Sequence, residues 1–441
     1  MKKLLIIITL LSTFLFARDI TLAEAEKLAL ENNIQIKLSE ASLQKAKASS
    51  HETLANFFPT ISSFYQLTDN LELSVMVVDF DGDGPSPAQE IRMGKQFSST
   101  AGIQLSYPVF TGGAIINGQL MASAAVNLSK LSLQDQINTV IHTIRVLYYQ
   151  TQMLESMIEA TERGLQSAKE SYELALKRQA VGQTTKLDIL QAQVRYESYK
   201  PQLVSLENQR VSALTNLKTF INDPSLDAVT VIGKLEQSPN PYAGLTMEDL
   251  LEITQAERLE LKIAEEQKKL AKYQRNIALS GIMPKVQLGS AVQWQGNADA
   301  IADLDHKRSS NISVSVSLPL FNGGKNAASI QKASIGVKEA GYQFEQIEDF
   351  IYADVDAAYR KVAETMENIY ATEGVVAQAE EALRLSKLLY NTGSATQLDL
   401  MAAESGYLGA RSNYISSVFQ YNMAVETLKK SLNNLLINSG E

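Results

Sequence analysis

The sequence of 441 residues contains no cysteine, which excludes a disulfide framework, a thiolate nucleophile and a lipid-bearing N-terminal cysteine. Its three histidines, His51, His142 and His306, do not have the spacing of metal ligands. No phosphate-binding loop, dinucleotide fingerprint or nucleophile elbow occurs in it. We therefore predict that the protein is not an enzyme and that it requires no cofactor.

The sequence also lacks a basic cluster and, beyond its first residues, a long apolar run. Its 40 Lys and Arg against 49 Asp and Glu give a net charge of −9, which argues against a nucleic-acid partner. Residues 1–17, MKKLLIIITLLSTFLFA, combine two lysines, a short apolar run and a final small residue, as secretory signal peptides do. An uncleaved anchor is the less favoured interpretation, because the run is short for a membrane span. We expect an exported chain that crosses any membrane with strands.

A strand pattern followed by a tight turn and a long helical pattern occurs twice. Residues 98–110 alternate between apolar and polar side chains, which is typical of a strand with one apolar face. A proline, which has no N–H to donate, is expected to end each strand, and two glycines then permit a sharp turn. The residues of these strand-to-helix turns are Pro108, Gly112 and Gly113 and, 211 positions later, Pro319, Gly323 and Gly324. The chain is therefore predicted to be a tandem duplication.

The duplication divides the chain into two similar halves. The first repeat, 18–220, contains a helix, a strand hairpin at 57–110, a long helix, a tip turn at 181–185 and a returning helix. The second repeat, 246–437, has its strand hairpin at 284–321 and its tip turn at 392–396. Residues 221–245 connect the two repeats, and 438–441 form a tail.

The helical patterns predict a fold that is mainly α with a small β part. The first helices of the two repeats, 21–55 and 246–280, align with an offset of 225. The long helix after each hairpin spans about 65 residues, or about 100 Å, which is typical of a coiled coil. Pro201 predicts a kink or short break in the first returning helix.

Four strands per chain cannot close a barrel, and open sheet edges are not tolerated in lipid. Closure in a lipid bilayer therefore needs several chains, and three copies would supply twelve strands, which is a plausible barrel size. The apolar faces would contact that lipid, with Tyr107 and Trp294 as anchors at its boundary. The polar faces would line a lumen with Thr100, Gln104, Ser106, Gln287, Gln293, Ser313, Ser315 and Ser317.

The paired turns Pro-Val-Phe-Thr-Gly-Gly and Pro-Leu-Phe-Asn-Gly-Gly, the duplicated plan and the paired Gly-x₅-Asp tips resemble the TolC-type outer-membrane efflux protein family. The resemblance implies a trimeric twelve-stranded barrel in the outer membrane of a Gram-negative bacterium, continued by a long α-helical barrel in the periplasm. It also implies an exit duct of a tripartite efflux pump or type I secretion system, which docks a periplasmic adaptor and an inner-membrane transporter. Two other interpretations remain, a trimeric outer-membrane adhesin or structural protein and, less favoured, a secreted soluble coiled coil.

The resemblance also assigns residues to a periplasmic gate. Asp188 and Asp399 match acids that surround the narrow entrance, and Tyr390 matches a tyrosine that links neighbouring helix pairs there. The alternative for both acids is a favourable charge at a helix N-terminus, and for Tyr390 it is ordinary packing. Ala395 stands where the family can have an arginine, and Ala402 where it can have a second acid. A second carboxylate ring is therefore not expected.

The two tip turns are small and polar, which suits a docking surface for adaptor hairpins. The residues proposed for docking are Val181, Gly182 and Thr184 in the first tip and Thr392, Gly393 and Ala395 in the second. The same composition also satisfies simple turn chemistry, because glycine suits a positive φ.

A weak calcium-loop pattern lies in the first hairpin. Asp79, Asp81, Asp83 and Glu90 fit the template D-x-D-x-D-G-x₅-E, whose carboxylates suit a hard cation. However, the preceding run, 71–78, looks strand-like rather than helical, and two prolines interrupt the loop. An acidic, solvated surface loop is the favoured interpretation.

Overall fold

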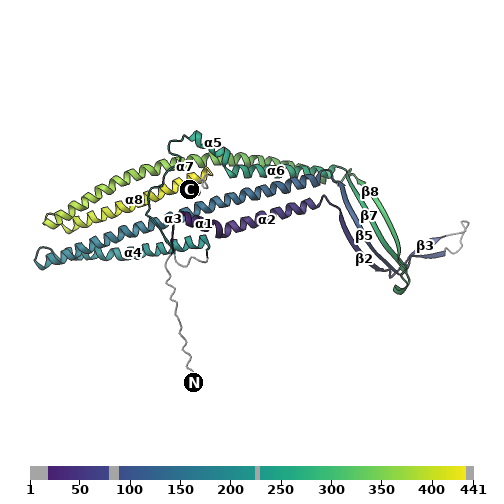
Figure 1. The fold of residues 1–441 in the computed structure, drawn as a ribbon, viewed down its shortest axis with the longest axis horizontal. Helices are drawn as coiled ribbons and strands as arrows, with labels where there is room; N and C mark the ends of the chain where they lie inside the picture. Colours follow the sequence, from purple (N-terminus) through teal and green to yellow (C-terminus); the bar gives the residue numbers. More distant parts are fainter. Residues whose placement is uncertain (1–17, 79–88, 224–228, 434–441) are drawn as a thin grey trace, which may run out of the picture. The chain divides into compact units, whose positions relative to one another are not determined.

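The computed structural model describes residues 18–78, 89–223 and 229–433 (Figure 1). The predicted signal peptide and the predicted tail lie outside these residues. The chain forms two compact units. We call residues 44–128 and 264–343 the strand unit, and the remainder the helical unit. The predicted fold class, mainly α with a small β part, is confirmed.

The strand unit contains a four-stranded antiparallel sheet of order β2-β5-β7-β8. Its strands are β2 (Thr60–Asp69), β5 (Phe97–Phe110), β7 (Lys285–Ala298) and β8 (Lys307–Ser317). Each repeat contributes one hairpin, and the β5–β7 pairing joins the two. Within the described chain β2 and β8 are therefore edge strands. The segment 69–96, expected to be a loop, carries an additional ribbon of β3 (Ser74–Val78) and β4 (Gln89–Met93).

The register separates the sheet into one apolar and one polar face, because successive side chains point to opposite sides. Ile61, Tyr65 and Ile312 lie on the apolar face and are 67%, 68% and 80% exposed. On the polar face, four rows cross all four strands in the order β2, β5, β7, β8. These rows are Thr60/Ser106/Gly289/Ser313, Ser62/Gln104/Ala291/Asn311, Phe64/Gly102/Gln293/Ser309 and Gln66/Thr100/Gln295/Lys307.

The turns from strand to helix have the conformation that their glycines permit. Gly112 and Gly113 have φ of 64° and 86°, and Gly323 and Gly324 have φ of 67° and 81°. Gly112 is constrained twice, since a Cβ there would lie 2.5 Å from the Met283 Cβ. Pro108 does not end its strand as expected: β5 continues to Phe110, and a register shift against β7 absorbs the proline. In the second repeat β8 ends at Ser317, before Pro319.

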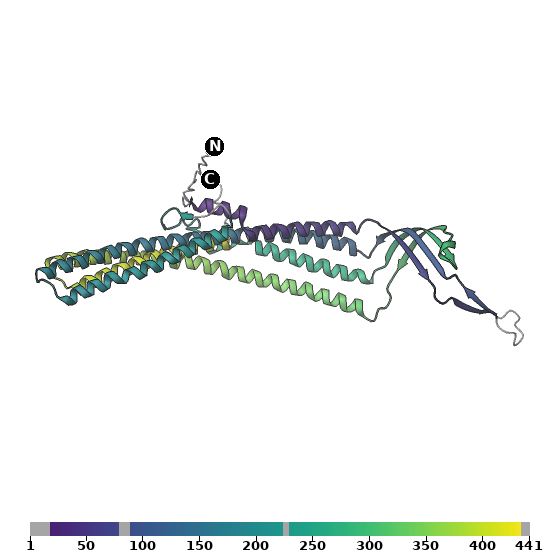
Figure 2. The same ribbon diagram turned by 90° about the horizontal axis from the view of Figure 1, so that it is seen from below.

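The helical unit is dominated by two helical hairpins (Figures 1 and 2). Helix α3 (Ala114–Ala180), which begins in the strand unit, turns back into α4 (Lys186–Ile221). Helix α7 (Lys325–Thr392), which also begins there, turns back into α8 (Gln397–Ser431). Pro201 lies inside α4 without interrupting it, so the expected break is absent. None of the helices in the described ranges combines the length and the apolarity of a membrane span.

Each repeat has its own apolar core within the helical unit. The first joins α1 (Leu22–Asn32) to α3 and α4 around Ile144 and Leu217. The second joins α5 (Met247–Glu257) to α7 and α8 around Val355 and Val425. A parallel pair of short strands, β1 (Arg18–Ile20) and β6 (Val229–Val231), was not foreseen from the sequence. It places Ile20 in the first core.

The first helix of each repeat is broken, contrary to the prediction of continuous helices at 21–55 and 246–280. Asn33 separates α1 from α2 (Ile34–Ala55), and Arg258 separates α5 from α6 (Leu259–Leu279). Both break residues leave the helical region, with ψ of 131° and 119°.

The same pair of contacts holds both breaks. Asn33 Nδ2 donates to the Phe220 carbonyl at 2.7 Å, and Arg258 Nη1 donates to the carbonyl of Ser431, the residue 211 positions later. In return Asn222 Nδ2 donates to the Asn32 carbonyl at 3.2 Å, and Asn433 Nδ2 donates to the Glu257 carbonyl at 2.8 Å. Asn222 and Asn433 both have a positive φ, as asparagine tolerates. We call each set of contacts a break clamp.

Candidate gate and docking tips

The first tip begins where α3 ends and closes on a capping box. Gly182 supplies a positive φ of 73°. Asp188 Oδ2 then accepts hydrogen bonds from the Thr185 backbone N–H at 3.0 Å, the Thr185 hydroxyl at 2.7 Å and the Thr184 hydroxyl at 2.9 Å. The Asp188 N–H donates back to the Thr185 hydroxyl. These contacts satisfy donors that the start of α4 would otherwise leave unpaired.

The second tip repeats this geometry with one hydroxyl fewer. Gly393 has φ of 81°, and Asp399 Oδ2 accepts from the Thr396 backbone N–H at 2.9 Å and the Thr396 hydroxyl at 2.6 Å. Ala395 occupies the position that Thr184 has in the first tip. The carboxylate of Asp399 therefore lacks the third donor.

Hydrogen bonds favour the ionised form of both candidate gate acids. The threonine hydroxyl bonds, followed by the backbone bonds, lower the pKa of Asp188 and of Asp399, while burial opposes this effect. The same box, Thr246 with Asp249, lowers the pKa of Asp249 at the start of α5, away from the tips. The local geometry of Asp188 and Asp399 thus performs helix capping, whichever further role they have.

Tyr390 connects the two helical hairpins near their tips. It is 3% exposed, and its ring lies under the Arg178 guanidinium at 4.4 Å from the ring centroid. The pKa of Tyr390 is raised above its ordinary value. Burial has the largest effect; the Arg178 guanidinium lowers the pKa, and the Asp188 carboxylate raises it. Arg178 also donates to the Asn391 carbonyl at 2.8 Å. Arg178 was not singled out from the sequence, although a cation in the last turn of a helix was a usable signal.

A buried carboxylate behind the tips was also missed. Glu404 in α8 is 4% exposed, and its Oε1 accepts from the hydroxyls of Ser167 and Ser171 in α3 at 2.9 and 3.0 Å. These bonds join the two hairpins of one chain a second time. Ala402, where the family can have a second acid, lies two residues before this buried carboxylate.

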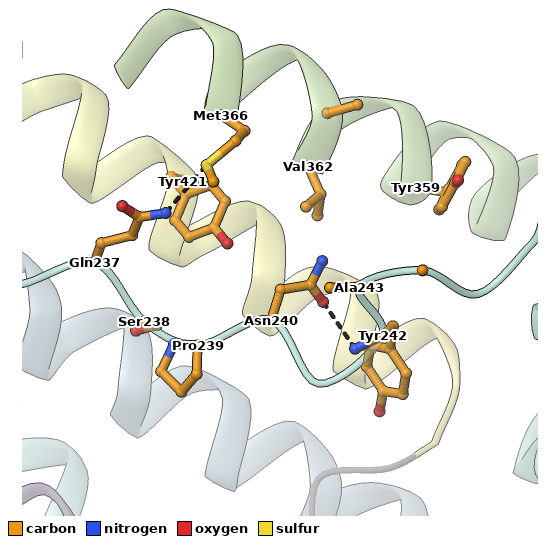
Figure 3. Close-up of a pocket in the computed structure, with 12 residues that line it drawn as sticks. Gln237, Ser238, Pro239, Asn240, Tyr242, Ala243, Tyr359, Val362, Met366 and Tyr421 are labelled. Carbon is orange, nitrogen blue, oxygen red and sulfur yellow. Dashed lines mark hydrogen bonds between the residues drawn. The ribbon is translucent and has the colours of Figure 1, made fainter. Parts of the chain in front are cut away.

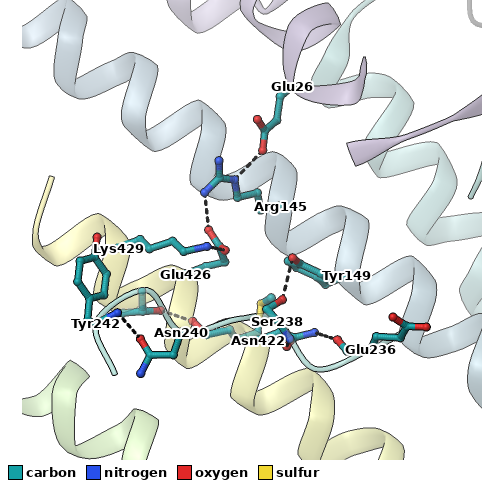
Figure 4. A network of polar contacts seen from close by, with 12 residues as sticks. Glu26, Arg145, Tyr149, Glu236, Ser238, Asn240, Tyr242, Asn422, Glu426 and Lys429 are labelled. Carbon is teal, nitrogen blue, oxygen red and sulfur yellow. Dashed lines mark hydrogen bonds and ion pairs between the residues drawn. The ribbon is translucent and has the colours of Figure 1, made fainter. Parts of the chain in front are cut away.

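A charged network lies inside the helical unit, away from the tips (Figure 4). Arg145 donates to Glu26 at 2.6 Å and to Glu426 at 2.7 Å, and Lys429 donates to Glu426 at 2.7 Å. These hydrogen bonds and charges raise the pKa of Arg145 against the effect of burial. Two cations and two anions balance, as buried charges require. The network joins α1, α3 and α8.

The segment between the repeats is fixed beside this network. The Ser238 N–H donates to Asn422 Oδ1 at 2.8 Å, and Asn422 Nδ2 donates to the Glu236 carbonyl at 2.8 Å. The same segment borders a largely apolar groove of about 560 Å³ (Figure 3). Tyr242, Tyr359 and Met366 line this groove together with α8. It contains none of the predicted site residues.

The calcium-loop pattern is not part of the described geometry. Asp79, Asp81 and Asp83 lie outside the described residues, as does the side chain of Glu90. Elsewhere in the described chain, no three histidine or acidic side chains gather in a way that could hold a metal ion.

Known proteins are similar in sequence to this chain over most of its length. A profile of the family described as outer membrane efflux protein matches residues 26–223 and 250–434. The chain is 25% identical over 314 residues to the pyoverdine export outer membrane protein OpmQ of Pseudomonas aeruginosa, and the match covers 70% of this chain and 64% of OpmQ. It is 22% identical over 350 residues to the outer membrane protein TolC of Escherichia coli, with coverages of 77% and 70%. The match thus spans a little under two thirds of OpmQ and somewhat more of TolC.

The fold itself occurs in solved channel structures. The CmeC outer membrane channel of Campylobacter jejuni aligns with a TM-score of 0.78 at 17% identity, over 94% of this chain and 85% of that one. The duplicated hairpins, the long paired helices and the two tips are thus the fold of solved outer-membrane channels. The chain belongs to the outer membrane efflux protein family and is a protein of the Gram-negative outer membrane. The resemblance seen in the sequence is confirmed, and the adhesin interpretation is not favoured.

Proposed function

We propose that the chain forms, as a homotrimer, the outer-membrane exit duct of a tripartite efflux pump or type I secretion system. The duct is passive: it provides a water-filled path and performs no catalysis, and the energy comes from an inner-membrane transporter. A periplasmic adaptor opens the tips. The observation that carries this proposal is the four-stranded sheet, which has one apolar face, one polar face and two open edges.

The sheet argues for three copies. β2 and β8 each pair on one side only within the described chain, and open edges cost several kcal/mol per unpaired group in lipid. The apolar face is exposed in one chain: Val314 and Val316 on β8 are each 68% exposed. Pairing β8 of one copy with β2 of the next satisfies both edges, and three copies give twelve strands.

The gate proposal rests on the ionisation of the tip acids. Three copies bring three Asp188 and three Asp399 carboxylates to one entrance, and the capping hydrogen bonds of each chain lower the pKa of both acids. A ring of like charges attracts cations and repels anions. Tyr390 under Arg178 holds the two hairpins of each chain together beside this ring.

The docking proposal rests on the exposed tip turns. Val181 is 68% exposed, although it is apolar, and it lies directly before Gly182 in the turn. An adaptor hairpin would contact Val181, Gly182 and Thr184 in one tip and Thr392, Gly393 and Ala395 in the other.

Conductance in a planar bilayer tests the duct and the gate together. We expect purified wild-type trimers to give a small, cation-preferring conductance, which rises or loses its preference in Asp188→Ala/Asp399→Ala. Asp249→Ala is the matched control, because it removes the same capping box from a helix away from the tips. A large conductance that the double substitution does not change would keep the duct and refute the gate residues. Folded trimers without conductance would refute the duct and favour a structural protein.

A further inference from the structure

The polar face of the sheet is almost free of charged and aromatic side chains. The four rows that cross all strands contain serine, threonine, glutamine, asparagine, alanine and glycine, with two exceptions. One exception is Lys307, at the end of β8 next to the loop. The other is Phe64 on β2, which faces Gly102 on β5 and lies in one row with Gln293 and Ser309. An aromatic ring in the middle of a polar face requires an explanation.

Gly102 provides the space in which this ring lies. A Cβ added to Gly102 would lie 3.0 Å from Phe64 Cζ, 3.0 Å from the Val292 carbonyl oxygen and 3.1 Å from the Gln293 Cβ. The φ of Gly102 is outside the left-handed region, so the backbone conformation does not demand glycine there. Glycine at this position therefore leaves room for the Phe64 ring over β5, and equally for the Val292 carbonyl oxygen and the Gln293 Cβ on the next strand.

We propose that Phe64 forms an aromatic collar in the strand part of the duct and that bulky apolar cargo, above all apolar cations, contacts this collar in transit. The proposal rests on the function proposed above, in which the polar face lines the lumen. Three copies place three rings at one level, since the threefold axis of a symmetric trimer relates equivalent residues. Apart from Lys307 at the loop end, the other side chains of the four rows are uncharged, and water can satisfy their polar groups equally well.

The chemistry of the row favours this class of cargo. The face of an aromatic ring attracts cations and buries apolar surface, and the Gln293 amide beside it adds no charge. A hydrated inorganic ion keeps its water shell and gains little from the ring. The collar thus distinguishes bulky organic cations from small ions without a charged residue.

Block of single channels by tetraphenylphosphonium, added on the side of the strand loops, tests the collar. We expect the apparent Kd of block to rise about 3- to 10-fold in Phe64→Ala, and to stay near the wild-type value in Phe64→Tyr, which retains the ring. Tyr65→Ala is the matched control, because Tyr65 is the next residue on the opposite, apolar face. Gly102→Ala, which displaces the ring, should also change the block.

The absence of cysteine supplies an independent readout of the face. Ser62→Cys on the polar face should react with a water-soluble methanethiosulfonate reagent, whereas Tyr65→Cys in lipid should not. If Ser62→Cys is unreactive in folded trimers, the polar face does not line a water-filled lumen, and the proposed function itself is refuted. If it reacts but Phe64→Ala leaves the block unchanged, the collar alone is refuted and Phe64 only fills the space over Gly102. Should Phe64→Ala not fold, Phe64→Leu keeps the volume and removes the ring, and the same two outcomes apply.

Discussion

The two repeats use the same backbone solution with different side chains. In each repeat, the residue at the helix break donates a hydrogen bond to a carbonyl at the end of that repeat's last helix. An asparagine of positive φ just after that helix donates one in return. The first repeat uses the neutral amide of Asn33, whereas the second uses Arg258, which also pairs with Asp354 and Glu260 at 2.9 Å each. Both repeats therefore share the backbone geometry of the break, whereas the side chain at the break differs between them.

A second pair of equivalent positions differs more strongly. Arg145 in α3 corresponds to Asp356 in α7, 211 positions later. Arg145 is buried in the network with Glu26 and Glu426, whereas Asp356 pairs with Arg360 one turn away on the surface. One repeat thus supplies the central cation of the unit, and the other supplies an ordinary exposed ion pair.

The largest expected effect is at this pair. Arg145→Met leaves two buried carboxylates with one fewer cation, and we expect it to lower the free energy of unfolding by about 3–5 kcal/mol. Asp356→Asn should cost less than about 0.5 kcal/mol, since exposed ion pairs contribute little. Thermal denaturation followed by circular dichroism in detergent measures both. Equal shifts of the melting midpoint would contradict the difference between the repeats.

The break clamps should give an intermediate effect. Arg258→Ala leaves Asp354 and the Ser431 carbonyl without their donor, and we expect a loss of about 2–3 kcal/mol. Asn33→Ala removes the hydrogen bond to the Phe220 carbonyl and the one accepted from the Gln35 N–H, and should cost about 1–2 kcal/mol. Denaturant titration of the two variants checks the order. If Asn33→Ala is the more damaging, the added ion pairs of the second clamp contribute nothing.

The smallest effect concerns the capping boxes of the tips. Thr185→Ala and Thr396→Ala should each cost about 1 kcal/mol, and Thr184→Ala less, because Ala395 shows that the second tip closes without that hydroxyl. Thermal melting at neutral pH measures these losses.

The same boxes predict the sign of a pH dependence. The folded pKa values of Asp188 and Asp399 lie below the ordinary value of 3.8, so their stabilisation is complete above that value and is lost as the pH falls through the folded pKa. Between about pH 5 and pH 3, the melting midpoint should therefore fall less in Asp188→Asn/Asp399→Asn than in the wild type. An equal fall in both would show that the boxes do not set the acid response.

The sequence predicted the features that depend on residues close together in the chain. The strands, the long helices, the tips and the duplication follow from alternation, glycines and offsets within the sequence. The breaks at Asn33 and Arg258 could not be predicted in this way, because neither residue is a proline or glycine and the carbonyl to which each donates lies more than 170 positions away. Glu404 and Arg178 were missed for the same reason, since their contacts join α3 to the second hairpin. The kink or break predicted at Pro201 is absent, because a long helix that packs along its length tolerates one missing backbone N–H donor.

The order of the strands has a consequence for how the chain matures after export. β5 lies between β2, its neighbour in sequence, and β7, which arrives only after both helices of the first hairpin. Until β7 pairs with it, β5 has one edge without its neighbour. During that interval it is a template for premature pairing with another nascent chain.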